Sequence, residues 1–470
     1  MIDRQPATRK VLLADRRRIH LVGAGGAGMN AIGVVLAEMG HEISGSDLRG
    51  GPGMTRLAAH GARVEIGHDA ANLGEAELVA HSSAVHASNV ELAAARARGL
   101  QVLSRAEMLG SICDRKRTFA VAGTHGKTTT SSMLALCLVA AGEQPSFLIG
   151  GEVNEIGSGA VWDPSGEWFV VEADESDGTF LELGAQGALV TSIEADHLDH
   201  YGSFPALTAA FERFLSSATD SRVVCADDPV ASEASERVGG TMTYGTSPHA
   251  HYRVVNALSF RSGARFELLG GGTAIGSCEL PLPGMHNILN AAGALAAALE
   301  MGAAAEPMLE ALGRFGGVAR RFERRGESAG VAYIDDYAHL PSEVAAAVAA
   351  AAGGGWKRII AVFQPHRYTR TAALWQDFAH SFGVADHIVL TDIYAAGEVP
   401  QPGISAELIA QAVLDAHPEA SVEYSPGRSE LRAHLRGLLR PGDLCLTLGA
   451  GDLTTLPDEL MFPAGDSTDV

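Results

Sequence analysis

The stretch Thr118-Phe-Ala-Val-Ala-Gly-Thr-His-Gly-Lys-Thr128 joins an apolar run to a glycine-rich loop, and a helix-like segment follows from about Thr129 to Ala141. Residues 123–128 read GxxGKT, a shortened form of the phosphate-loop pattern GxxxxGK[ST] in which Val121 replaces the first glycine. A strand, loop and helix in this order present backbone N–H groups and a helix N-terminus to phosphates. The stretch therefore predicts a nucleotide site, in which Lys127 reaches the β- and γ-phosphates and Thr128 holds Mg²⁺.

Two acidic clusters follow apolar runs further along the chain. One is Glu172-Ala-Asp-Glu-Ser-Asp177 and the other is Glu194-Ala-Asp-His-Leu-Asp199. Open α/β sheets bind ligands at the carboxyl ends of their strands, so both clusters are placed to serve the nucleotide.

A magnesium ion bound to a nucleotide takes one or two carboxylates from the protein. Glu172 is the predicted ligand because it directly follows the apolar run, and Asp174 and Glu175 are the alternatives. The His197-Leu-Asp-His200 spacing also occurs in zinc sites, but four zinc ligands are not evident. An imidazole can also join a magnesium site.

A second glycine loop, Gly23-Ala-Gly-Gly-Ala-Gly28, follows the apolar run Arg18–Val22. Together with Asp47 it matches the dinucleotide fingerprint GxGxxG, in which the acid binds a ribose hydroxyl. Because such a loop binds a pyrophosphate whatever lies at either end, a nucleotide sugar fits it as well as NAD does.

Basic residues gather late in the chain. His366-Arg-Tyr-Thr-Arg370 follows the apolar run Arg358–Phe363 and predicts an anion clamp, because guanidinium groups match carboxylates and phosphates. Arg320 and Arg321 form a second pair at a predicted domain boundary, where they contact phosphate only if the boundary folds over the preceding domain.

Strands alternate with helices throughout, which predicts parallel, doubly wound α/β sheets. A length of 470 residues suggests three domains at roughly 150 residues each. We predict an N-terminal Rossmann-like domain at 1–115, a central P-loop ATPase-like domain at 116–319 and a C-terminal Rossmann-like domain at 320–470. Only the tail after about Pro463 is expected to be disordered.

The composition argues against several classes of partner. A net charge of −21 argues against nucleic acid, which needs dense basic surfaces. The five cysteines are scattered and odd in number, which predicts free buried thiols in a reducing cytoplasm. The first residues, Met1–Pro6, lack signal-peptide features, and no run of about 18 apolar residues predicts membrane insertion. The expected location is cytoplasmic, and monomer and homodimer both stay open.

Nine motifs in order, from about Ile19 to Asp452, resemble the Mur ligases of bacterial cell-wall synthesis. They are Gly23–Met29, Ser82–Val85, Gly123–Thr130, Glu172–Asp177, Leu282–Asn287 with Asn290, Gly317–Phe322, Asp335–Tyr337, Phe363–Arg370 and Gly449–Asp452. Within the family the chain is most similar to members that ligate L-alanine to UDP-N-acetylmuramate in peptidoglycan biosynthesis. The resemblance implies ATP and Mg²⁺, transfer of the γ-phosphoryl group to the lactyl carboxylate, and attack of the alanine amine on the acyl phosphate.

The resemblance also implies roles for individual residues. The UDP-sugar would contact Gly23, Gly25, Gly26, Gly28, Met29, Asp47, His68, Ser83, His366, Arg367 and Arg370. ATP would contact Gly123, Thr124, His125, Gly126, Lys127, Thr128, Thr129, His286, Asn290, Arg321, Asp336 and Tyr337. Magnesium would be held by Thr128, Glu172 and His197, and the catalytic residues would be Lys127, His197 and Arg370.

Three positions depart from the family pattern. Leu340 stands where a second histidine often follows His339, Val90 replaces a proline, and Ser192 replaces an asparagine. None of these removes a residue that the chemistry obviously needs.

Other functions stay open. A ligase that attaches a recycled murein tripeptide to the same sugar nucleotide shares most of the motifs. An NAD-dependent oxidoreductase would use the Gly23–Gly28 loop but leave the phosphate loop and the acidic clusters without a role. A non-catalytic nucleotide sensor would bind without turnover.

Overall fold

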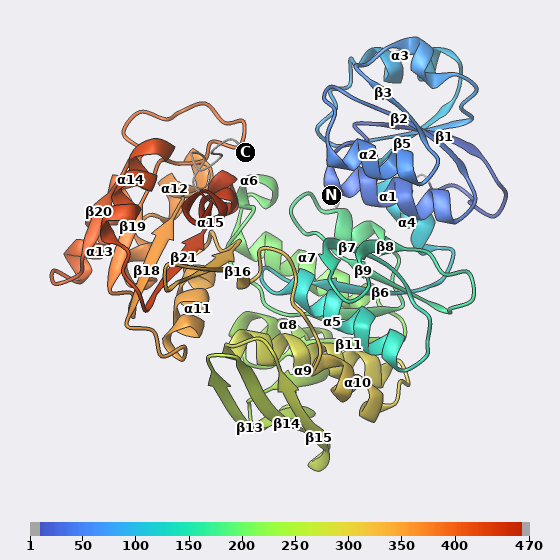
Figure 1. Cartoon of the computed structure of the whole chain (residues 1–470). Helices are drawn as coiled ribbons and strands as arrows, with labels where there is room; N and C mark the ends of the chain where they lie inside the picture. The colour runs from blue at the N-terminus through green and yellow to red at the C-terminus, as the bar shows by residue number, and fades with distance from the viewer. Residues whose placement is uncertain (1–9, 463–470) are drawn as a thin grey trace, which may run out of the picture. The chain divides into compact units, whose positions relative to one another are not determined.

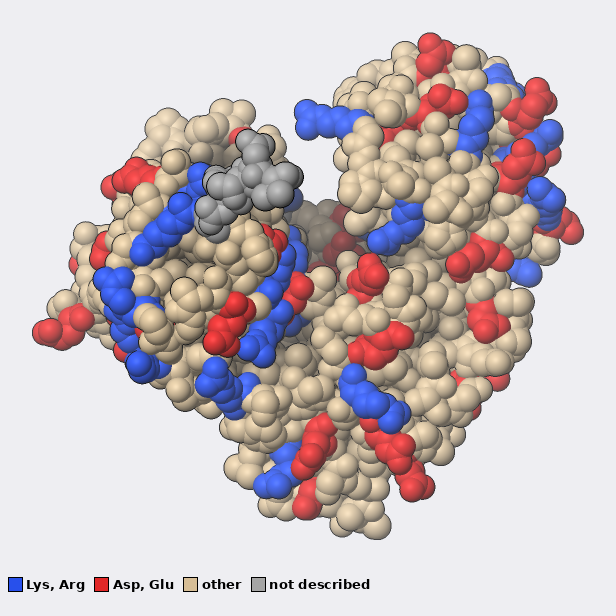
Figure 2. Space-filling view, in the orientation of Figure 1, with Lys and Arg blue, Asp and Glu red and all other residues tan. Residues whose placement is uncertain are grey.

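The computed structural model describes residues 10–462, and the chain divides into two compact units. The first comprises residues 1–255, 267–278 and 289–315, and the second comprises 256–266, 279–288 and 316–470. The predictions for Met1–Pro6 and for the tail after Pro463 lie outside the described residues. Acidic and basic side chains occur on the visible face of both units (Figure 2).

The first unit begins with a parallel sheet of strand order β3-β2-β1-β4-β5 (Figure 1). Its strands are β1 (Arg18–Val22), β2 (Glu42–Asp47), β3 (Arg63–Ile66), β4 (Leu78–His81) and β5 (Gln101–Ser104). Its helices are α1 (Ala27–Glu38), α2 (Pro52–Ala59), α3 (Val90–Ala97) and α4 (Arg105–Cys113), with a short 3₁₀ turn at Ala70–Leu73. The order reverses between β1 and β4, which is where open α/β sheets bind their ligands.

Helix α1 lies close to the sheet because Gly33 has no side chain. A Cβ at Gly33 would lie 2.7 Å from Leu21 on β1 and 2.7 Å from Leu57 on α2. This close packing fixes the start of α1, and with it the glycine loop that precedes the helix.

The second sheet has the strand order β15-β14-β13-β12-β11-β10-β6-β9-β7-β8. Its strands are β6 (Arg117–Ala122), β7 (Ser146–Val153), β8 (Ser158–Val161), β9 (Trp168–Glu172), β10 (Gly187–Val190), β11 (Ser221–Cys225), β12 (Met242–Gly245), β13 (Tyr252–Phe260), β14 (Gly263–Gly270) and β15 (Thr273–Leu280). The accompanying helices are α5 (Lys127–Ala140), α6 (Leu198–Tyr201), α7 (Phe204–Ser217), α8 (Pro229–Val238), α9 (Met285–Glu300) and α10 (Ala305–Leu312), with a 3₁₀ turn at Thr179–Glu182.

Strand β6 lies in the interior of this sheet and pairs in parallel with β9 on one side and β10 on the other. The phosphate loop after β6 therefore emerges at the same edge as the two acidic clusters that follow β9 and β10. This parallel pairing places the predicted nucleotide residues together.

The second unit holds a sheet of strand order β16-β17-β21-β18-β19-β20, parallel except for the β16–β17 pair. Its strands are β16 (Glu323–Ser328), β17 (Val331–Asp336), β18 (Arg358–Phe363), β19 (His387–Leu390), β20 (Val422–Tyr424) and β21 (Asp443–Leu448). Its helices are α11 (Pro341–Ala352), α12 (Tyr368–Leu374), α13 (Glu407–Ala416), α14 (Arg428–Leu438) and α15 (Leu456–Met461), with 3₁₀ turns at Asp377–His380 and Asp452–Thr455.

Two further expectations can be compared with the structure. All five cysteines are buried and free, as predicted. In the part of the chain that the structure describes, no helix is both long and apolar enough to cross a membrane.

We predict that Gly33→Ala lowers the free energy of unfolding by about 1–3 kcal/mol, because the added methyl group overpacks the contact with Leu21 and Leu57. Urea denaturation followed by circular dichroism measures this change. The control is Gly437→Ala on α14, where a Cβ would meet nothing within 4 Å. This control is expected to be neutral or to stabilise by up to about 1 kcal/mol. Unchanged stability of Gly33→Ala would show that the close packing does not constrain α1.

Candidate active site

Residues that follow β10 hold the phosphate loop in place. The Thr124 N–H donates to the carbonyl oxygen of Ser192 at 2.9 Å, and the His125 N–H donates to Ser192 Oγ at 3.0 Å. The Glu194 N–H in turn donates to Thr124 Oγ1 at 2.8 Å. Ser192, one of the departures from the family pattern, therefore supports the loop with its hydroxyl group.

Gly126 lies between the loop and α5 with φ of +75°, a left-handed conformation that favours glycine. A Cβ there would clash with Asn290 Oδ1, which accepts a hydrogen bond from Thr130 Oγ1 at 3.2 Å. The structure thus brings Asn290, a predicted ATP residue, to the start of α5. No acidic residue lies in the first turn of this 14-residue helix, so its N-terminus is suited to phosphate.

Lys127 is held within the loop. Its Nζ donates to the carbonyl oxygen of Gly123 at 2.6 Å and to Glu175 Oε1 at 2.8 Å. Burial alone would lower the pKa of Lys127, but the carboxylates of Glu175 and Asp174 outweigh it, so the pKa is raised and the lysine is charged.

Glu175 is almost fully buried, with 2% of its surface exposed. Its Oε2 is a buried atom without a hydrogen-bond partner among the described residues. Burial raises the pKa of Glu175, and the charge of Lys127 offsets part of this effect. Glu175, an alternative magnesium ligand in the sequence prediction, is here the counter-ion of Lys127.

Thr128 and Glu172, two of the predicted magnesium ligands, lie side by side. Thr128 Oγ1 donates to Glu172 Oε1 at 2.9 Å, and the Gly150 N–H donates to Glu172 Oε2 at 2.7 Å. A hydroxyl and a carboxylate at the end of a phosphate loop are hard oxygen donors, so these residues fit Mg²⁺.

His197, the third predicted ligand, has a positive φ of +53° and lies with its Nε2 3.3 Å from Asp196 Oδ2. Among the side chains that the structure describes, which do not include that of Asp199, no three His, Cys, Asp or Glu residues form a metal-binding group. The role of His197 on a second ion stays a prediction.

The N-terminal glycine loop is anchored to the end of β2. The N–H groups of Gly23 and Ala24 both donate to the carbonyl oxygen of Ser46 at 2.9 Å, and the Gly25 N–H donates to Asp47 Oδ2 at 2.9 Å. Asp47, predicted to bind a ribose, here secures the loop.

His68 and Ser83 follow β3 and β4, so they lie at the same carboxyl edge as Asp47. Ser83 is exposed. Met29 is buried in the core of the first unit, so it can reach a ligand only through its backbone.

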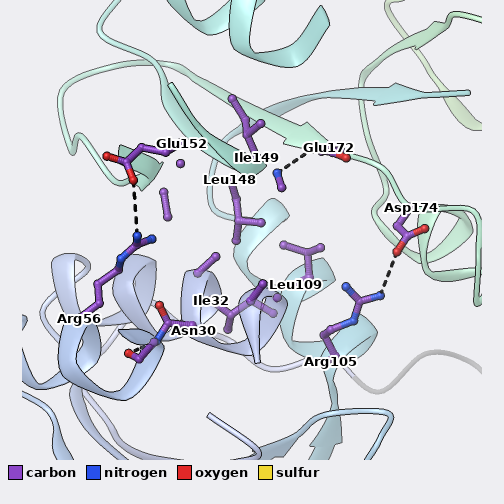
Figure 3. A pocket seen from close by; sticks show the side chains of 18 of the residues that line it. Asn30, Ile32, Arg56, Arg105, Leu109, Leu148, Ile149, Glu152, Glu172 and Asp174 are labelled. Atoms are coloured by element: carbon purple, nitrogen blue, oxygen red, sulfur yellow. Dashed lines mark hydrogen bonds and ion pairs between the residues drawn. The ribbon is translucent and has the colours of Figure 1, made fainter. Parts of the chain in front are cut away.

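A cavity of about 530 Å³ extends from the glycine loop to Glu172, one of the predicted magnesium ligands (Figure 3). One wall carries Gly25, Gly28 and Asn30, and the other carries Gly150, Glu172 and Asp174. Its volume lies within the range of about 300–1,000 Å³ typical of small-molecule sites. The predicted UDP-sugar loop and the predicted magnesium ligand Glu172 therefore line one cavity.

Two arginines that the sequence prediction missed also line this cavity. Arg105 Nη2 lies 2.9 Å from Asp177 and 3.8 Å from Asp174, and Arg56 lies 3.6 Å from Glu152 (Figure 3). Arg105 could have been found, because Ser104 and Glu107 form a capping box that starts α4 directly after β5. That signal places Arg105 at the ligand-binding edge of the sheet.

In the second unit, Asp336 ends β17 and accepts two backbone hydrogen bonds. The N–H groups of Phe322 and Ala338 donate to its two oxygens at 2.7 Å each. Burial raises the pKa of Asp336 to about 6, although Arg321 and these N–H groups act in the opposite direction.

Aromatic rings and guanidinium groups form a row that begins beside Asp336, at Arg321 and Tyr337, and ends at Arg370. Arg321 lies over the Tyr337 ring at 4.9 Å, and His339 lies edge-on to Tyr337 with the ring centroids 5.4 Å apart. The His339 and His366 centroids are 5.8 Å apart, and Arg370 Nη1 lies 3.1 Å from His366 Nδ1. Residues that the prediction divided between ATP and the sugar substrate therefore form one row in this unit.

His366 is uncharged near neutral pH. Burial, together with His339, Arg370 and Arg367, lowers its pKa to about 4. Its Nδ1 therefore accepts the hydrogen bond from Arg370. Arg367, between them, has a φ of +70°, a backbone strain typical of functional sites.

Leu340, another departure from the family, is buried and directly precedes α11. Its N–H and that of His339 donate to Glu343 Oε2 at 3.1 and 2.9 Å. The Glu343 carboxylate thus holds this turn through two backbone N–H groups, without the Leu340 side chain. Val90, the remaining departure, is an exposed first residue of α3.

His286, predicted to face adenine, lies one helical turn before Asn290 on α9. Burial lowers its pKa to about 4, so the imidazole is neutral at pH 7. A neutral ring can stack on a base and offers one donor and one acceptor.

Three family models match the chain in order. They are the Mur ligase family catalytic domain at residues 18–117, the Mur ligase middle domain at 121–298 and the Mur ligase glutamate ligase domain at 320–451. The chain belongs to the Mur ligase family. The family resemblance is confirmed, and so is the predicted α/β fold with three Mur ligase domains; the residue boundaries at 115/116 and 319/320 stay predictions.

Similar proteins cover almost the whole chain. A UDP-N-acetylmuramate–L-alanine ligase of Solidesulfovibrio magneticus is 45% identical over 93% of this chain and 96% of its own length. One from Kineococcus radiotolerans is 46% identical over 94% and 95%. The crystal structure of a UDP-N-acetylmuramate–alanine ligase from Thermotoga maritima matches with a TM-score of 0.79 at 28% identity, covering 95% of this chain and 98% of that one.

We predict that Gly126→Ala abolishes nucleotide binding, because the added Cβ would push against Asn290 and displace the phosphate loop. Calorimetric titration with ADP measures the effect. The matched control is Gly142→Ala at the other end of α5, which also has a positive φ, +83°, but whose Cβ would meet nothing within 4 Å. Both variants are expected to lose about 1 kcal/mol of stability or more through backbone strain. Wild-type ADP affinity in Gly126→Ala would contradict the role of the loop geometry.

Proposed function

We propose that the protein ligates L-alanine to UDP-N-acetylmuramate at the expense of ATP, through an acyl phosphate, as a step of peptidoglycan biosynthesis. The observation that supports this proposal is the cavity that runs from the glycine loop to Glu172, which accepts a hydrogen bond from Thr128. A sugar nucleotide bound by its pyrophosphate at Gly23–Gly28 has its sugar end directed toward the site of phosphoryl transfer.

The relatives support the choice of substrates. Eight proteins named UDP-N-acetylmuramate–L-alanine ligase are 41–46% identical to this chain over at least 93% of it. A murein peptide ligase of Psychrobacter arcticus also matches in structure, with a TM-score of 0.68, but at 23% identity it supports the fold alone.

The chemistry is mainly positioning and neutralisation of charge. The lactyl carboxylate oxygen attacks the γ-phosphorus of ATP, the bond to the β-bridging oxygen breaks, and ADP leaves. Lys127 neutralises the negative charge that shifts toward the leaving ADP. Thr128 and Glu172 would hold Mg²⁺ and His197 would bind a second ion, and a bound metal would supply further neutralisation of charge.

The second step forms the amide. The amine of L-alanine attacks the acyl carbon, the tetrahedral intermediate collapses, and inorganic phosphate leaves with the oxygen that bridged carbon and phosphorus. ATP binding also involves three residues of the second unit, Arg321, Asp336 and Tyr337. His366, Arg367 and Arg370 address the anionic end of the substrate.

The proposal extends to organisation and location. The three domains are residues 1–115, which bind the UDP-sugar, residues 116–319, which bind ATP, and the C-terminal α/β domain at residues 320–470. The protein acts in the cytoplasm, in keeping with five buried free thiols, since such thiols persist in a reducing compartment.

We predict that Lys127→Ala lowers alanine-dependent phosphate release from ATP by two orders of magnitude or more, because Lys127 is the only lysine or arginine in the loop that can neutralise the charge of the transition state. The assay contains ATP, Mg²⁺, UDP-N-acetylmuramate and L-alanine. Lys10→Ala is the control, since Lys10 makes only a partly exposed ion pair with Asp114 and such pairs contribute little.

The same assay separates the alternatives. Phosphate release that depends on L-alanine supports the proposal, whereas release that depends on a murein tripeptide favours the recycling ligase. Nucleotide binding without release would favour a sensor, and near-normal turnover by Lys127→Ala would contradict the assigned site.

A further inference from the structure

A wholly buried carboxylate, Glu91, lies at the centre of a hydrogen-bond network in the N-terminal sheet. Glu91 is 0% exposed although it is the second residue of α3. Its Oε2 accepts a hydrogen bond from Ser46 Oγ at 2.6 Å and lies 3.3 Å from His68 Nδ1. Its Oε1 accepts from Asn72 Nδ2 at 2.6 Å and from the Asp69 N–H at 3.2 Å.

Glu91 carries its negative charge. Burial alone would raise its pKa, but the His20 imidazole and the hydrogen bonds from Ser46 and Asn72 outweigh burial and lower the pKa to about 2. His20 is the other titratable group that faces this carboxylate, with its Nε2 3.5 Å from Glu91 Oε2 and its Nδ1 2.9 Å from Ser44 Oγ.

The network fixes where the proton of His68 lies. A serine hydroxyl has one hydrogen, and Ser46 uses it toward Glu91 at 2.6 Å. His68 Nδ1 is 3.0 Å from Ser46 Oγ, so at this contact the imidazole must be the donor. At this contact the proton therefore sits on Nδ1, next to the negative charge of Glu91.

His68 lies where a nucleotide would be recognised. It follows β3, Asp47 ends the neighbouring β2, and the carbonyl oxygen of Ser46 binds the N–H groups of Gly23 and Ala24. Ser46 thus links the glycine loop through its backbone and His68 through its side chain. The His68 side chain is 12% exposed, so the ring retains access to solvent and to a ligand.

We propose that Glu91, acting through Ser46, is a positioning residue that holds His68 in the Nδ1–H form, so that its Nε2 accepts a hydrogen bond from the uridine of the sugar nucleotide. The donor is an O–H or N–H of the nucleoside, either a ribose hydroxyl or the imide N–H of the base. This inference rests on the proposed function, because it takes the glycine loop to bind a uridine diphosphate.

The test is a double-mutant cycle on the full-length protein. Glu91→Gln and His68→Ala are each expected to weaken binding of UDP-N-acetylmuramate about tenfold by calorimetry, which is the loss of one good hydrogen bond. The double variant is expected to bind within twofold of His68→Ala alone, because Glu91 acts through that ring. In the ligase assay the KM for the sugar nucleotide should rise about tenfold while kcat stays within twofold.

Controls separate positioning from folding. Glu77→Gln removes a carboxylate before β4, at the opposite edge of the same sheet, and should leave binding unchanged. Ser46→Ala breaks the same link while it leaves the Glu91 carboxylate in place, and it should match Glu91→Gln. This variant covers the case in which Glu91→Gln fails to fold. The proposal would be overturned if adding Glu91→Gln to His68→Ala weakened binding further, about tenfold. Tenfold weaker binding by Glu77→Gln would also overturn it.

Nitrogen-15 NMR of the imidazole provides a readout that does not need catalysis. The wild type should show a protonated Nδ1 at His68, and a protonated Nε2 with bare Nδ1 would overturn the inference. Uridine diphosphates that lack the 2′-hydroxyl, lack the 3′-hydroxyl or are methylated at N3 identify the donor, since one of them should lose its sensitivity to His68→Ala. Full sensitivity of all three would contradict a nucleoside contact. If the wild type binds no UDP-sugar, the proposed function fails, whereas normal binding by all Glu91 and Ser46 variants defeats only this inference.

Discussion

Parallel pairing of β6 with β9 on one side and β10 on the other is the constraint on which the candidate active site depends. A parallel neighbour delivers its carboxyl end to the same edge of the sheet, so the phosphate loop, Glu172 and Glu194 emerge together. The loop is then tied to the residues that follow β10 by backbone hydrogen bonds through Ser192. Changes that shift the register of β6 would therefore move the lysine, the hydroxyl and the carboxylates together.

The ion pair between Lys127 and Glu175 at this edge of the sheet is incompletely satisfied. Lys127 is neutralised by Glu175, whose second oxygen is buried without a partner in the described structure. An unsatisfied buried polar atom costs about 1–3 kcal/mol, so the pair is not an optimal stabilising contact. In the proposed function Lys127 leaves this carboxylate for the phosphates of a nucleotide, and the imperfect pairing would lower the free energy needed for that exchange.

Most of the fold and the principal site residues could be predicted from the sequence, because the signals are local. Apolar runs that end in Gly123–Thr128, Gly23–Gly28 and Glu172 identified strands, loops and a carboxylate, and each lies at the expected edge of its sheet. Boundaries were less accurate: α5 begins at Lys127 and not at Thr129, because Gly126 adopts a left-handed conformation that ends the loop earlier.

The remaining features depend on tertiary contacts. Glu91 reads as an ordinary surface residue of α3, and only the packing of that helix near Ser46 and Asn72 buries its carboxylate. Arg105 gains its place at the cavity through ion pairs with Asp174 and Asp177, more than 60 residues away. The row from Arg321 to Arg370 joins segments that the sequence assigned to two ligands.

The central claim is that ATP activates the carboxylate of the sugar nucleotide as an acyl phosphate. It is tested most directly with UDP-N-acetylmuramate carrying ¹⁸O in both carboxylate oxygens, incubated with ATP and L-alanine. Mass spectrometry of the inorganic phosphate should show one ¹⁸O atom per phosphate, with the other label retained in the amide product. Phosphate without ¹⁸O, formed together with the amide, would contradict the account.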